Sequence, residues 1–211
     1  GEFHPCKKQE GVDGTKDAYT ALNIKDKDRG ISEIKVYGGK FYNFNPTSYI
    51  PNNRIAQQGA DGYYAVAEAA AKIGDVKYAD LASAINAAQA GETVTLLRNI
   101  NLGDLSSAVV VKKSITIDGE GYWTITVNSV NDTFNNAAFA PRGPISYTFK
   151  NLTIDLKNAA SEMAAFSMKY GGALENVTVK GAFGQAVSVT MAYPVTVTNC
   201  AFDGATWGVY A

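Results

Sequence analysis

The chain has 211 residues, of which 46% are hydrophobic and 18% charged, a composition typical of a folded protein and unlike that of a disordered one. Its 19 basic and 20 acidic residues give a formal net charge of −1, which argues against a nucleic-acid partner. The longest mostly apolar run, residues 65–71, is too short to cross a bilayer, so we expect no membrane insertion. Cys6 and Cys200 are too far apart in the sequence to indicate a disulfide framework or a metal site, and we expect no cofactor.

The N-terminal stretch, residues 1–16, is polar and contains the single histidine, His4. It begins GEFHPCKKQ, which resembles a vector-derived remnant or the start of a mature exported chain. We therefore expect residues 1–16 to be disordered or vector-derived and to lie outside the fold.

Aromatic residues are concentrated in two segments, KFYNFNP at 40–46 and DGYYAV at 61–66. Alternation along a strand buries some of these side chains and exposes others. Exposed tyrosine rings beside Asn, Gln and Asp can stack on sugar rings, and we predict this ligand-binding role for Tyr42 and Tyr63. The alternative is that the aromatic residues only fill the core and the corners of the fold.

A short amphipathic helix is predicted after Asp80, whose side chain can cap the helix N-terminus. The apolar face of this helix consists of Leu81, Ala84, Ile85 and Ala88. Gly91 ends the helix, and residues 93–97 are predicted to form the first strand of a sheet. We expect the helix to cover the open end of the core, where strand edges would otherwise be unpaired.

One pattern of alternating apolar and polar residues is repeated in the C-terminal half, as KKSITIDG (112–119), KNLTIDLK (150–157), ENVTVKGA (175–182) and TNCAFDGA (198–205). The positions that we align across these four segments are Ser114, Asn151, Asn176 and Asn199. The last two steps, from 151 to 176 and from 176 to 199, are similar in length, whereas the first, from 114 to 151, is longer. This spacing is typical of a solenoid in which an insertion, residues 128–146, lengthens one coil.

Two further sets of short apolar strands lie between these segments, at 147–149 and 195–197 and at 165–168, 186–189 and 208–211. Three short strands per coil, stacked in parallel, predict a β-helix. Asparagine tolerates the left-handed backbone conformation of a sharp corner, and its amide can bond to the equivalent residue one coil away. We therefore predict a structural ladder of Ser114, Asn151, Asn176 and Asn199.

The segment AKIGDVKYADLASAINAAQAGETVTLL (71–97), followed by SITIDGEG and the asparagine-led coils, resembles the right-handed parallel β-helix proteins of the pectate-lyase-like superfamily. More narrowly, it is similar to the β-helical modules of gut-bacterial surface proteins and adhesins and of phage fibres. The resemblance covers residues 31–211 and implies an all-β fold, a right-handed parallel β-helix solenoid with an N-terminal amphipathic capping helix.

The resemblance also implies how the chain is divided. Residues 17–72 would be the end of a preceding β-helical unit, with strands at 19–26 and 31–39, and residues 73–211 would hold the capping helix and the coils. The chain stops at Ala211 inside a predicted strand without a capping segment. We therefore expect a truncated solenoid that continues in a longer protein or self-associates through its open C-terminal end.

The resemblance implies candidate catalytic residues as well, because lyases of the superfamily use carboxylates and a basic residue, and its glycosidases pair aspartates on adjacent coils. The comparable outward positions are Asp118, Asp155, Lys180 and Asp203. With the alignment above, Asp118 and Asp155 would be neighbours about 4.8 Å apart, and Lys180 would lie beside Asp155. The alternative is a solvated face, since turn aspartates often precede glycine and Lys180 with Asp155 is an ordinary cross-strand charge pair.

Further candidate ligand-binding residues lie in the predicted solenoid. Tyr122 and Trp123 follow the first coil, and Arg142 lies between two prolines in the insertion 128–146. Long loops of solenoids often form the binding face, but a tolerated bulge explains this one equally well.

These features favour a non-catalytic structural or adhesive module of a secreted or surface-exposed bacterial or phage-fibre protein, located outside the cell or on its surface. We expect its partner to be a glycan or a host-surface receptor. Two alternatives stay open, a fragment of a carbohydrate-active enzyme (polysaccharide lyase or glycoside hydrolase) and a purely structural spacer. An enzyme needs converging carboxylates, an adhesin needs exposed aromatic or polar rows, and a spacer needs a smooth, threonine-rich face.

Overall fold

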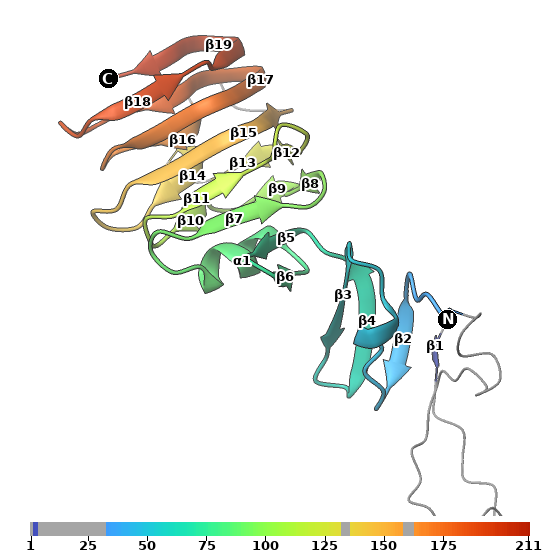
Figure 1. The fold of residues 1–211 in the computed structure, drawn as a ribbon. Helices are drawn as coiled ribbons and strands as arrows, with labels where there is room; N and C mark the ends of the chain where they lie inside the picture. The colour runs from blue at the N-terminus through green and yellow to red at the C-terminus, as the bar shows by residue number, and fades with distance from the viewer. Residues whose placement is uncertain (1, 4–32, 132–135, 158–162) are drawn as a thin grey trace, which may run out of the picture. The chain divides into compact units, whose positions relative to one another are not determined.

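The computed structural model of the chain describes residues 2–3, 33–131, 136–157 and 163–211. They belong to two compact units, of which the first ends at Ala69 and the second begins at Ala70. Most of the predicted N-terminal stretch 1–16 lies outside the described residues, as does the strand predicted at 19–26. Figure 1 shows a sheet in the first unit and a stack of coils in the second.

The first unit contains a four-stranded sheet in the order β1-β2-β4-β3. Its elements are β1 (Glu2–Phe3), β2 (Gly39–Tyr42), the 3-10 helix η2 (Thr47–Tyr49), β3 (Arg54–Gln58) and β4 (Tyr63–Glu68). β1 pairs with β2 in parallel, whereas β2 and β3 both pair with β4 in the antiparallel direction. An ion pair of 3.1 Å between Arg54 and Glu68 joins the outer ends of β3 and β4.

One face of this sheet packs into a small apolar core. Phe41 is fully buried, and Val36 and Val66 are nearly so. The side chains packed around them are Ile34, Phe44, Tyr49, Ile50, Ala56 and Tyr64. The opposite face of the sheet is therefore not part of this core.

The strand predicted at 31–39 is wrong in its described part, since residues 33–38 form no strand and β2 begins at Gly39. Strands β2 to β4 pair antiparallel, whereas neighbouring coils of a β-helix pair in parallel. The physical reason is that the short connection 59–62 between β3 and β4 closes a hairpin. That residues 17–72 are the end of a preceding β-helical unit stays a prediction.

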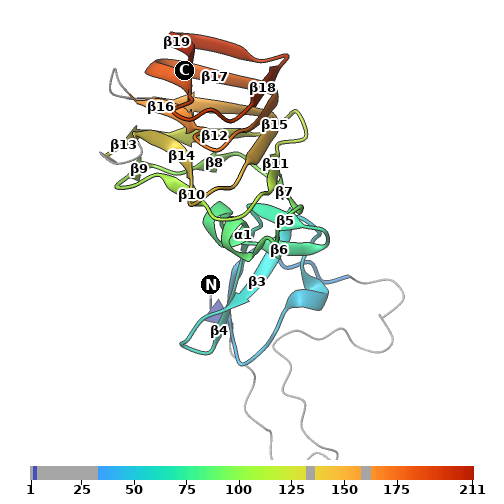
Figure 2. The same cartoon turned by 90° about the vertical axis from the view of Figure 1, so that its left-hand side faces the viewer.

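The second unit is an all-β parallel solenoid of about four turns with one α-helix. Figures 1 and 2 show its strands stacked coil upon coil. The first face stacks β7 (Thr93–Leu96), β11 (Thr116–Asp118), the starts of β15 (Tyr147–Leu156) and β17 (Gly172–Ser188), and β18 (Val195–Thr198). The second face stacks β8 (Ile100–Asn101), β12 (Thr124–Val127), the end of β15, the middle of β17 and the start of β19 (Ala201–Tyr210). The third face stacks β10 (Val109–Val111), β14 (Ala137–Pro141), β16 (Ala164–Ser167) and the ends of β17 and β19.

A further pair of short strands, β9 (Asp104–Leu105) and β13 (Ser129–Val130), joins the first two coils between the second and third faces. The Ser129 hydroxyl donates to the Asp104 carboxylate across this pair. The strands at 147–149, 165–168, 186–189, 195–197 and 208–211 were thus placed correctly by the sequence to within a few residues.

The register of the first face gives the relative length of each coil. The residues paired across it are Thr93, Thr116, Thr148, Ala173 and Thr196. The coil from Thr116 to Thr148 is the longest, and the other three are similar to one another in length.

This register corrects the alignment expected from the sequence. Ile117 pairs with Phe149, and not with Ile154 as predicted, so Ser114 is not equivalent to Asn151. The residue beside Asn151 is Gly119, whose amide donates to the Lys150 carbonyl oxygen. The reason is that SITID belongs to the strand before the corner, whereas the similar letters LTID follow the corner at Asn151.

The predicted helix is present as α1 (Leu81–Ala87). Asp80 caps it by accepting a hydrogen bond of 2.7 Å from the Ser83 amide. The buried side chains of α1 are Leu81, Ala84 and Ile85, and all three belong to the core cluster of the solenoid. The helix is therefore part of the same packed interior as the coils.

A hairpin that the sequence analysis did not predict precedes this helix. Strands β5 (Ala71–Ile73) and β6 (Val76–Tyr78) pair antiparallel across Gly74 and Asp75, and β5 also pairs antiparallel with β7. A glycine-led two-residue connection between short apolar runs is the sequence signal of such a hairpin. The hairpin occupies the edge of the first strand of the solenoid.

Aromatic rings fill the interior of the middle coils. The Phe149 ring lies 4.8 Å, between centroids, from both Phe139 and Phe166. The hydroxyl of the buried Tyr147 lies 2.8 Å from the Ser167 carbonyl oxygen and 3.3 Å from that of Phe139. Burial raises the pKa of Tyr147, so its hydroxyl stays protonated and donates to these carbonyls.

Part of the insertion predicted at 128–146 belongs to the core and not to a surface loop. Its residues 137–141 form β14, which is buried throughout and pairs with β10 and β16. Ala138 and Phe139 of the apolar run AAFA belong to the core cluster of the solenoid, and Ala137 and Ala140 are buried as well. Residues 132–135 of the insertion lie outside the described residues.

Candidate functional site

The exposed face of the first unit's sheet gathers aromatic and polar side chains. Because side chains alternate along a strand, Lys40 and Tyr42 of β2 point away from the core that Phe41 enters. Tyr63 and Ala65 of β4 pair with Tyr42 and Lys40, respectively, and Gln57 of β3 pairs with Ala65. We call the set Lys40, Tyr42, Gln57, Tyr63 and Ala65 the tyrosine face.

The two predicted tyrosines of this face are in contact. The ring centroids of Tyr42 and Tyr63 are 5.1 Å apart at an interplanar angle of 54°, and 39% of Tyr42 is exposed. The Lys40 ammonium lies 5.8 Å from the centroid of the Tyr63 ring. The antiparallel register of β2 and β4 therefore joins two tyrosines that are far apart in the sequence.

A hollow of about 280 Å³ adjoins the pair. Its lining consists of Lys40, Gln57, Gln58, Gly59, Asp61, Tyr63 and Ala65. The Asp61 carboxylate accepts a hydrogen bond of 3.1 Å from the Tyr63 amide, which fixes the turn beside the ring. An ammonium, amides and a carboxylate around an aromatic and methyl floor are groups that orient a polar ligand with apolar faces.

A second hollow in the first unit has a volume of about 510 Å³. Its lining includes Lys35 and Glu33, which form an ion pair of 3.0 Å with each other. The Lys35 ammonium is therefore already paired with a carboxylate, whereas that of Lys40 lies over the Tyr63 ring.

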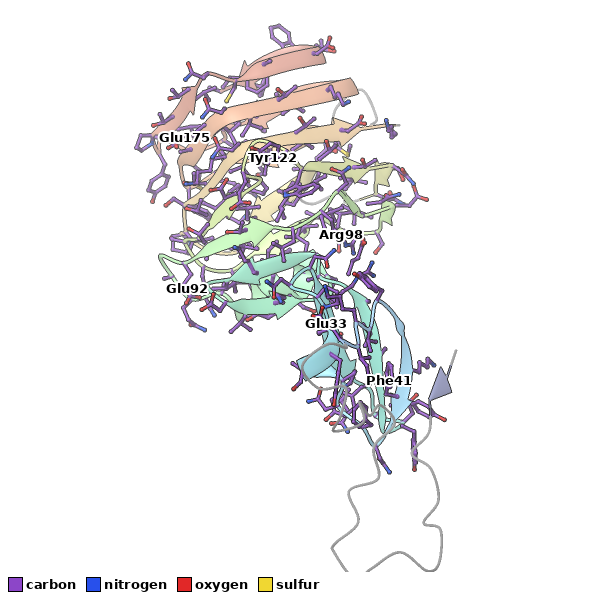
Figure 3. The ribbon with its side chains drawn as sticks, turned by 45° about the vertical axis from the view of Figure 1, so that its right-hand side comes forward. Glu33, Phe41, Glu92, Arg98, Tyr122 and Glu175 are labelled. Carbon is purple, nitrogen blue, oxygen red and sulfur yellow. The ribbon has the colours of Figure 1, made fainter. Side chains whose placement is uncertain are left out.

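Tyr122, Trp123 and Arg142 belong to the second unit, whereas the tyrosine face belongs to the first. Tyr122, labelled in Figure 3, is 79% exposed in the turn between β11 and β12, and Trp123 packs partly against the core. Arg142 is exposed after β14, and its amide donates to the Val111 carbonyl oxygen. That any of these three residues binds a ligand stays a prediction.

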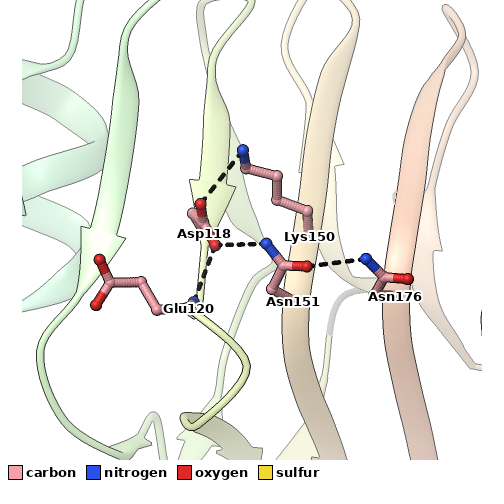
Figure 4. Close-up of polar contacts among 5 residues, drawn as sticks. All are labelled: Asp118, Glu120, Lys150, Asn151 and Asn176. Atoms are coloured by element: carbon pink, nitrogen blue, oxygen red, sulfur yellow. Dashed lines mark hydrogen bonds and ion pairs between the residues drawn. The ribbon is translucent and has the colours of Figure 1, made fainter.

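The asparagine corners of the solenoid carry a hydrogen-bonded row, drawn in Figure 4. Asn151, Asn176 and Asn199 all have a φ of 52–54°, the left-handed conformation expected at such corners. The Asn176 amide donates to the Asn151 side-chain oxygen at 3.0 Å, and the Asn151 amide donates to Asp118 at 3.1 Å. Among the described residues Asn199 forms no such bond, so the row runs from Asp118 to Asn176.

Asp118 is held as a carboxylate at the start of this row. Partial burial acts to raise its pKa, but hydrogen bonds from the Glu120 amide, the Asn151 amide and Lys150 outweigh burial and lower the pKa below its usual value. The Lys150 ammonium lies 3.3 Å from the carboxylate. Asp118 therefore acts as an anionic anchor between two coils.

The predicted catalytic residues do not form one group. Asp118 pairs in register with Lys150, whereas Asp155 pairs with Thr126 on one side and Lys180 on the other, as predicted for Lys180. The two aspartates are therefore not cross-strand neighbours, which corrects the carboxylate pair inferred from the sequence alignment.

Ion pairs neutralise the second of these carboxylates. Asp155 is largely buried and lies 2.6 Å from the Lys157 ammonium and 3.8 Å from that of Lys180. Within the described ranges, no three His, Cys, Asp or Glu side chains are placed to hold a metal ion. These ion pairs and the row from Asp118 to Asn176 can stabilise the stacking of coils. In the described part of the chain they bring no acid and base together on one substrate position.

Sequence reasoning missed Lys40, Gln57 and Asp61, which line the hollow with Tyr63. Alternation alone places Lys40 on the side of Tyr42, so this signal was available in the sequence. Gln57 and Asp61 join the site only through the β3–β4 hairpin, which was not predicted.

Comparisons of the chain with protein-family models, with curated proteins and with solved structures found no match. The resemblance to the pectate-lyase-like superfamily therefore stays a prediction from the sequence pattern. In the described part of the chain, no helix is long and apolar enough to span a membrane.

Proposed function

We propose that the chain is a non-catalytic structural and adhesive module of a secreted or surface-exposed protein, and that its tyrosine face binds a glycan. The observation that supports this most is the contact between Tyr42 and Tyr63 beside a hollow lined by ammonium, amide and carboxylate groups. Tyrosine rings suit a sugar, because their apolar faces pack against C–H groups while their hydroxyls stay in water.

The solenoid is suited to act as a structural support. Thr124, Thr153 and Thr178 are in register along the second face, which gives a regular outward row. Each coil buries its apolar side chains against its neighbours, so the stack is stiff along its length. The spacer alternative is thus compatible with adhesion, since the coils would act as the support and the sheet as the binding part.

We also propose that the solenoid winds in the right-handed sense and belongs to the pectate-lyase-like superfamily. The chain would then be part of a gut-bacterial surface protein or of a phage fibre, and α1 would cap the solenoid. The motif of residues 71–97 supports these assignments, as does the general rule that crossovers between parallel strands are right-handed. The position of α1 and the β5–β6 hairpin next to β7 supports the capping role.

The enzymatic alternative has less support. A lyase or a glycosidase of this superfamily would need carboxylates that converge on one substrate, whereas Asp118 and Asp155 are each paired with lysine on separate faces. Turnover of an acidic polysaccharide in the experiment below would support this enzymatic alternative.

The test is a glycan array probed with the full chain and with two single variants, Tyr63→Ala and Tyr122→Ala. We expect Tyr63→Ala to lower glycan binding about tenfold or more, because the lost ring contact is of the order of 1.5 kcal/mol. Tyr122→Ala is the matched control, since it removes an exposed tyrosine of the second unit and should leave binding unchanged.

Three other results would overturn parts of the proposal. Binding lost in Tyr122→Ala and kept in Tyr63→Ala would move the site to the corner of the solenoid. Turnover of an acidic polysaccharide that is lost in Asp155→Asn would establish the enzyme. If the chain showed neither glycan binding nor turnover, only the spacer function would remain.

A further inference from the structure

The tyrosine face contains a cation, Lys40, that forms no ion pair with the described carboxylates of residues 33–69. Of the other described cations of the first unit, Lys35 pairs with Glu33 and Arg54 pairs with Glu68, both in ion pairs of at most 3.1 Å. Lys40 of β2, whose register partner on β1 is Glu2, forms no ion pair with the described side chains of residues 33–69, and its ammonium lies 5.8 Å from the centroid of the Tyr63 ring. Lys40 therefore brings positive charge to the hollow.

The hollow has room for a ligand group between this cation and an amide. Ala65 lies on the central strand β4, with Lys40 opposite it on β2 and Gln57 opposite it on β3. Two strand spacings separate the backbones of Lys40 and Gln57 by about 10 Å, and only the Ala65 methyl group lies between them. A pyranose ring is about half that width, so it fits over Ala65 with a polar group at each side.

The lining of the hollow also carries a negative charge. The Asp61 carboxylate lies in the turn before Tyr63 and already accepts one hydrogen bond from the Tyr63 amide. Its remaining oxygen can accept hydrogen bonds from hydroxyl groups but would repel another carboxylate. An anionic ligand group would therefore be directed toward Lys40.

We propose that the tyrosine face recognises an acidic sugar, a uronic or sialic acid residue of a glycan. Its carboxylate pairs with the Lys40 ammonium, its ring lies over Ala65 against Tyr63, and its hydroxyls bond to the Gln57 amide and to Asp61. This inference depends on the proposed glycan-binding function and adds the chemical class of the ligand.

The experiment compares matched acidic and neutral ligands by calorimetric titration of the full chain. One pair is sialyllactose and lactose, and another is an oligogalacturonate and its carboxyl-reduced form. A sulfated lactose distinguishes recognition of a carboxylate from recognition of any anion. The variants are Lys40→Gln, which keeps a polar side chain of similar length, and Lys35→Gln as the matched control in the same unit.

We expect the acidic member of each pair to bind about tenfold more tightly than the neutral one, which is the effect of one charge-assisted hydrogen bond. Lys40→Gln should abolish this preference while leaving the neutral ligand unaffected, and Lys35→Gln should preserve it. Added salt should weaken the acidic ligand alone, because screening acts on the charge pair. If sulfated lactose bound as tightly as sialyllactose, the site would recognise anionic sugars in general and not a carboxylate in particular.

Two results separate failure of this inference from failure of the proposed function. One such result is a preference for the acidic ligand that survives Lys40→Gln. Another is equal binding of acidic and neutral ligands that Tyr63→Ala still removes. Either would refute the acidic ligand and leave glycan binding in place. No binding of any member of the series by the unaltered chain would refute both. Circular dichroism of each variant establishes that the fold is unchanged.

Discussion

Asn151 and Asn176 show how one residue type can serve both the backbone and the stack. Their φ values of 54° and 53° would cost most L-amino acids about 1–2 kcal/mol each. Asparagine reduces this cost, and its side chain then bonds to the coil below through Asn151 and Asp118. At the earlier corner the two tasks are divided, since Glu120 takes the left-handed conformation, with a φ of 51°, and Asp118 supplies the polar contact.

Asp118 makes the stability of the solenoid depend on pH. Its pKa in the folded chain lies below the usual value of 3.8, so its ionised form stabilises the fold at every pH above about 4. As the pH falls through the lowered pKa, the carboxylate is protonated and this contribution disappears. Urea unfolding of the chain and of Asp118→Asn should therefore differ most at neutral pH and converge as the pH falls through the lowered pKa of Asp118.

Asp104→Asn provides the control for this measurement, because that aspartate also bridges two coils but accepts its hydrogen bond from the neutral Ser129 hydroxyl. A difference between the chain and Asp118→Asn that stays constant from neutral to acidic pH would contradict the anchoring role of the carboxylate.

Among the elements, the later coils could be predicted and the first could not. Residues 147–149 and 195–197 were recognised because each coil repeats the same alternation. The first coil was misaligned because Thr116 pairs with Thr148 but Thr124 pairs with Thr153, so the turn between β11 and β12 is longer than its counterpart in β15. Two segments of similar sequence can therefore lie on different sides of a corner, and the sequence alone does not show which.

The candidate site was predictable to the same partial extent. Alternation predicted that some of the aromatic rings at 40–46 and 61–66 are exposed, and Tyr42 and Tyr63 were the candidates named for ligand binding. The hollow beside them depends on the pairing of β3 with β4, which brings Gln57 next to Ala65. Such pairing is set by tertiary contacts, and an isolated strand pattern does not specify its partner.

The glycine corner after the second face should tolerate no side chain. Gly181 has a φ of 110°, and a Cβ atom there would overlap the Leu156 carbonyl oxygen of the coil below. Gly181→Ala should therefore destabilise the chain by about 3 kcal/mol or more, through backbone strain and overlap together. The measurement is the midpoint of urea unfolding.

Gly121→Ala is the matched control for this corner. Gly121 also has a positive φ, 84°, but nothing lies within 4 Å of an added Cβ atom. It should lose only the strain contribution, about 1–2 kcal/mol. Equal losses in the two variants would show that coil stacking does not restrict the Gly181 corner.

In the second unit as a whole, an interior row runs through the third face and ends in an exposed residue. The row consists of Val109, Phe139, Phe166, Val187 and Val209. Phe139, Phe166 and Val187 are fully buried, whereas Val209 is 46% exposed. Other large apolar side chains exposed on the same last coil are Val197, Trp207 and Tyr210.

We expect this coil to mediate self-association of the chain. Within the described residues, β18 and β19 pair with β17 on one side only, so their outer backbone groups and apolar side chains are available to a second copy. Light scattering should show a mass that rises with concentration, and Val209→Glu should hold the chain monomeric. Val76→Glu alters another exposed valine and should have no effect.

A monomer at all concentrations, or an equal effect of both substitutions, would refute an interface at the last coil. Glycan binding measured on the monomeric variant would separate this interface from the tyrosine face.

The parallel stacking of the coils also determines how the solenoid responds to tension. Its strands lie across the long axis, so the hydrogen bonds between coils lie along that axis and a pull on the chain loads one outer coil at a time. Each detached coil would release the stretch between two paired positions, such as 116–148 or 148–173. Stretches of this length correspond to about 80–110 Å of extended chain. A module built in this way would lengthen in discrete steps under shear and keep its remaining coils intact, which limits the force that reaches any contact it holds.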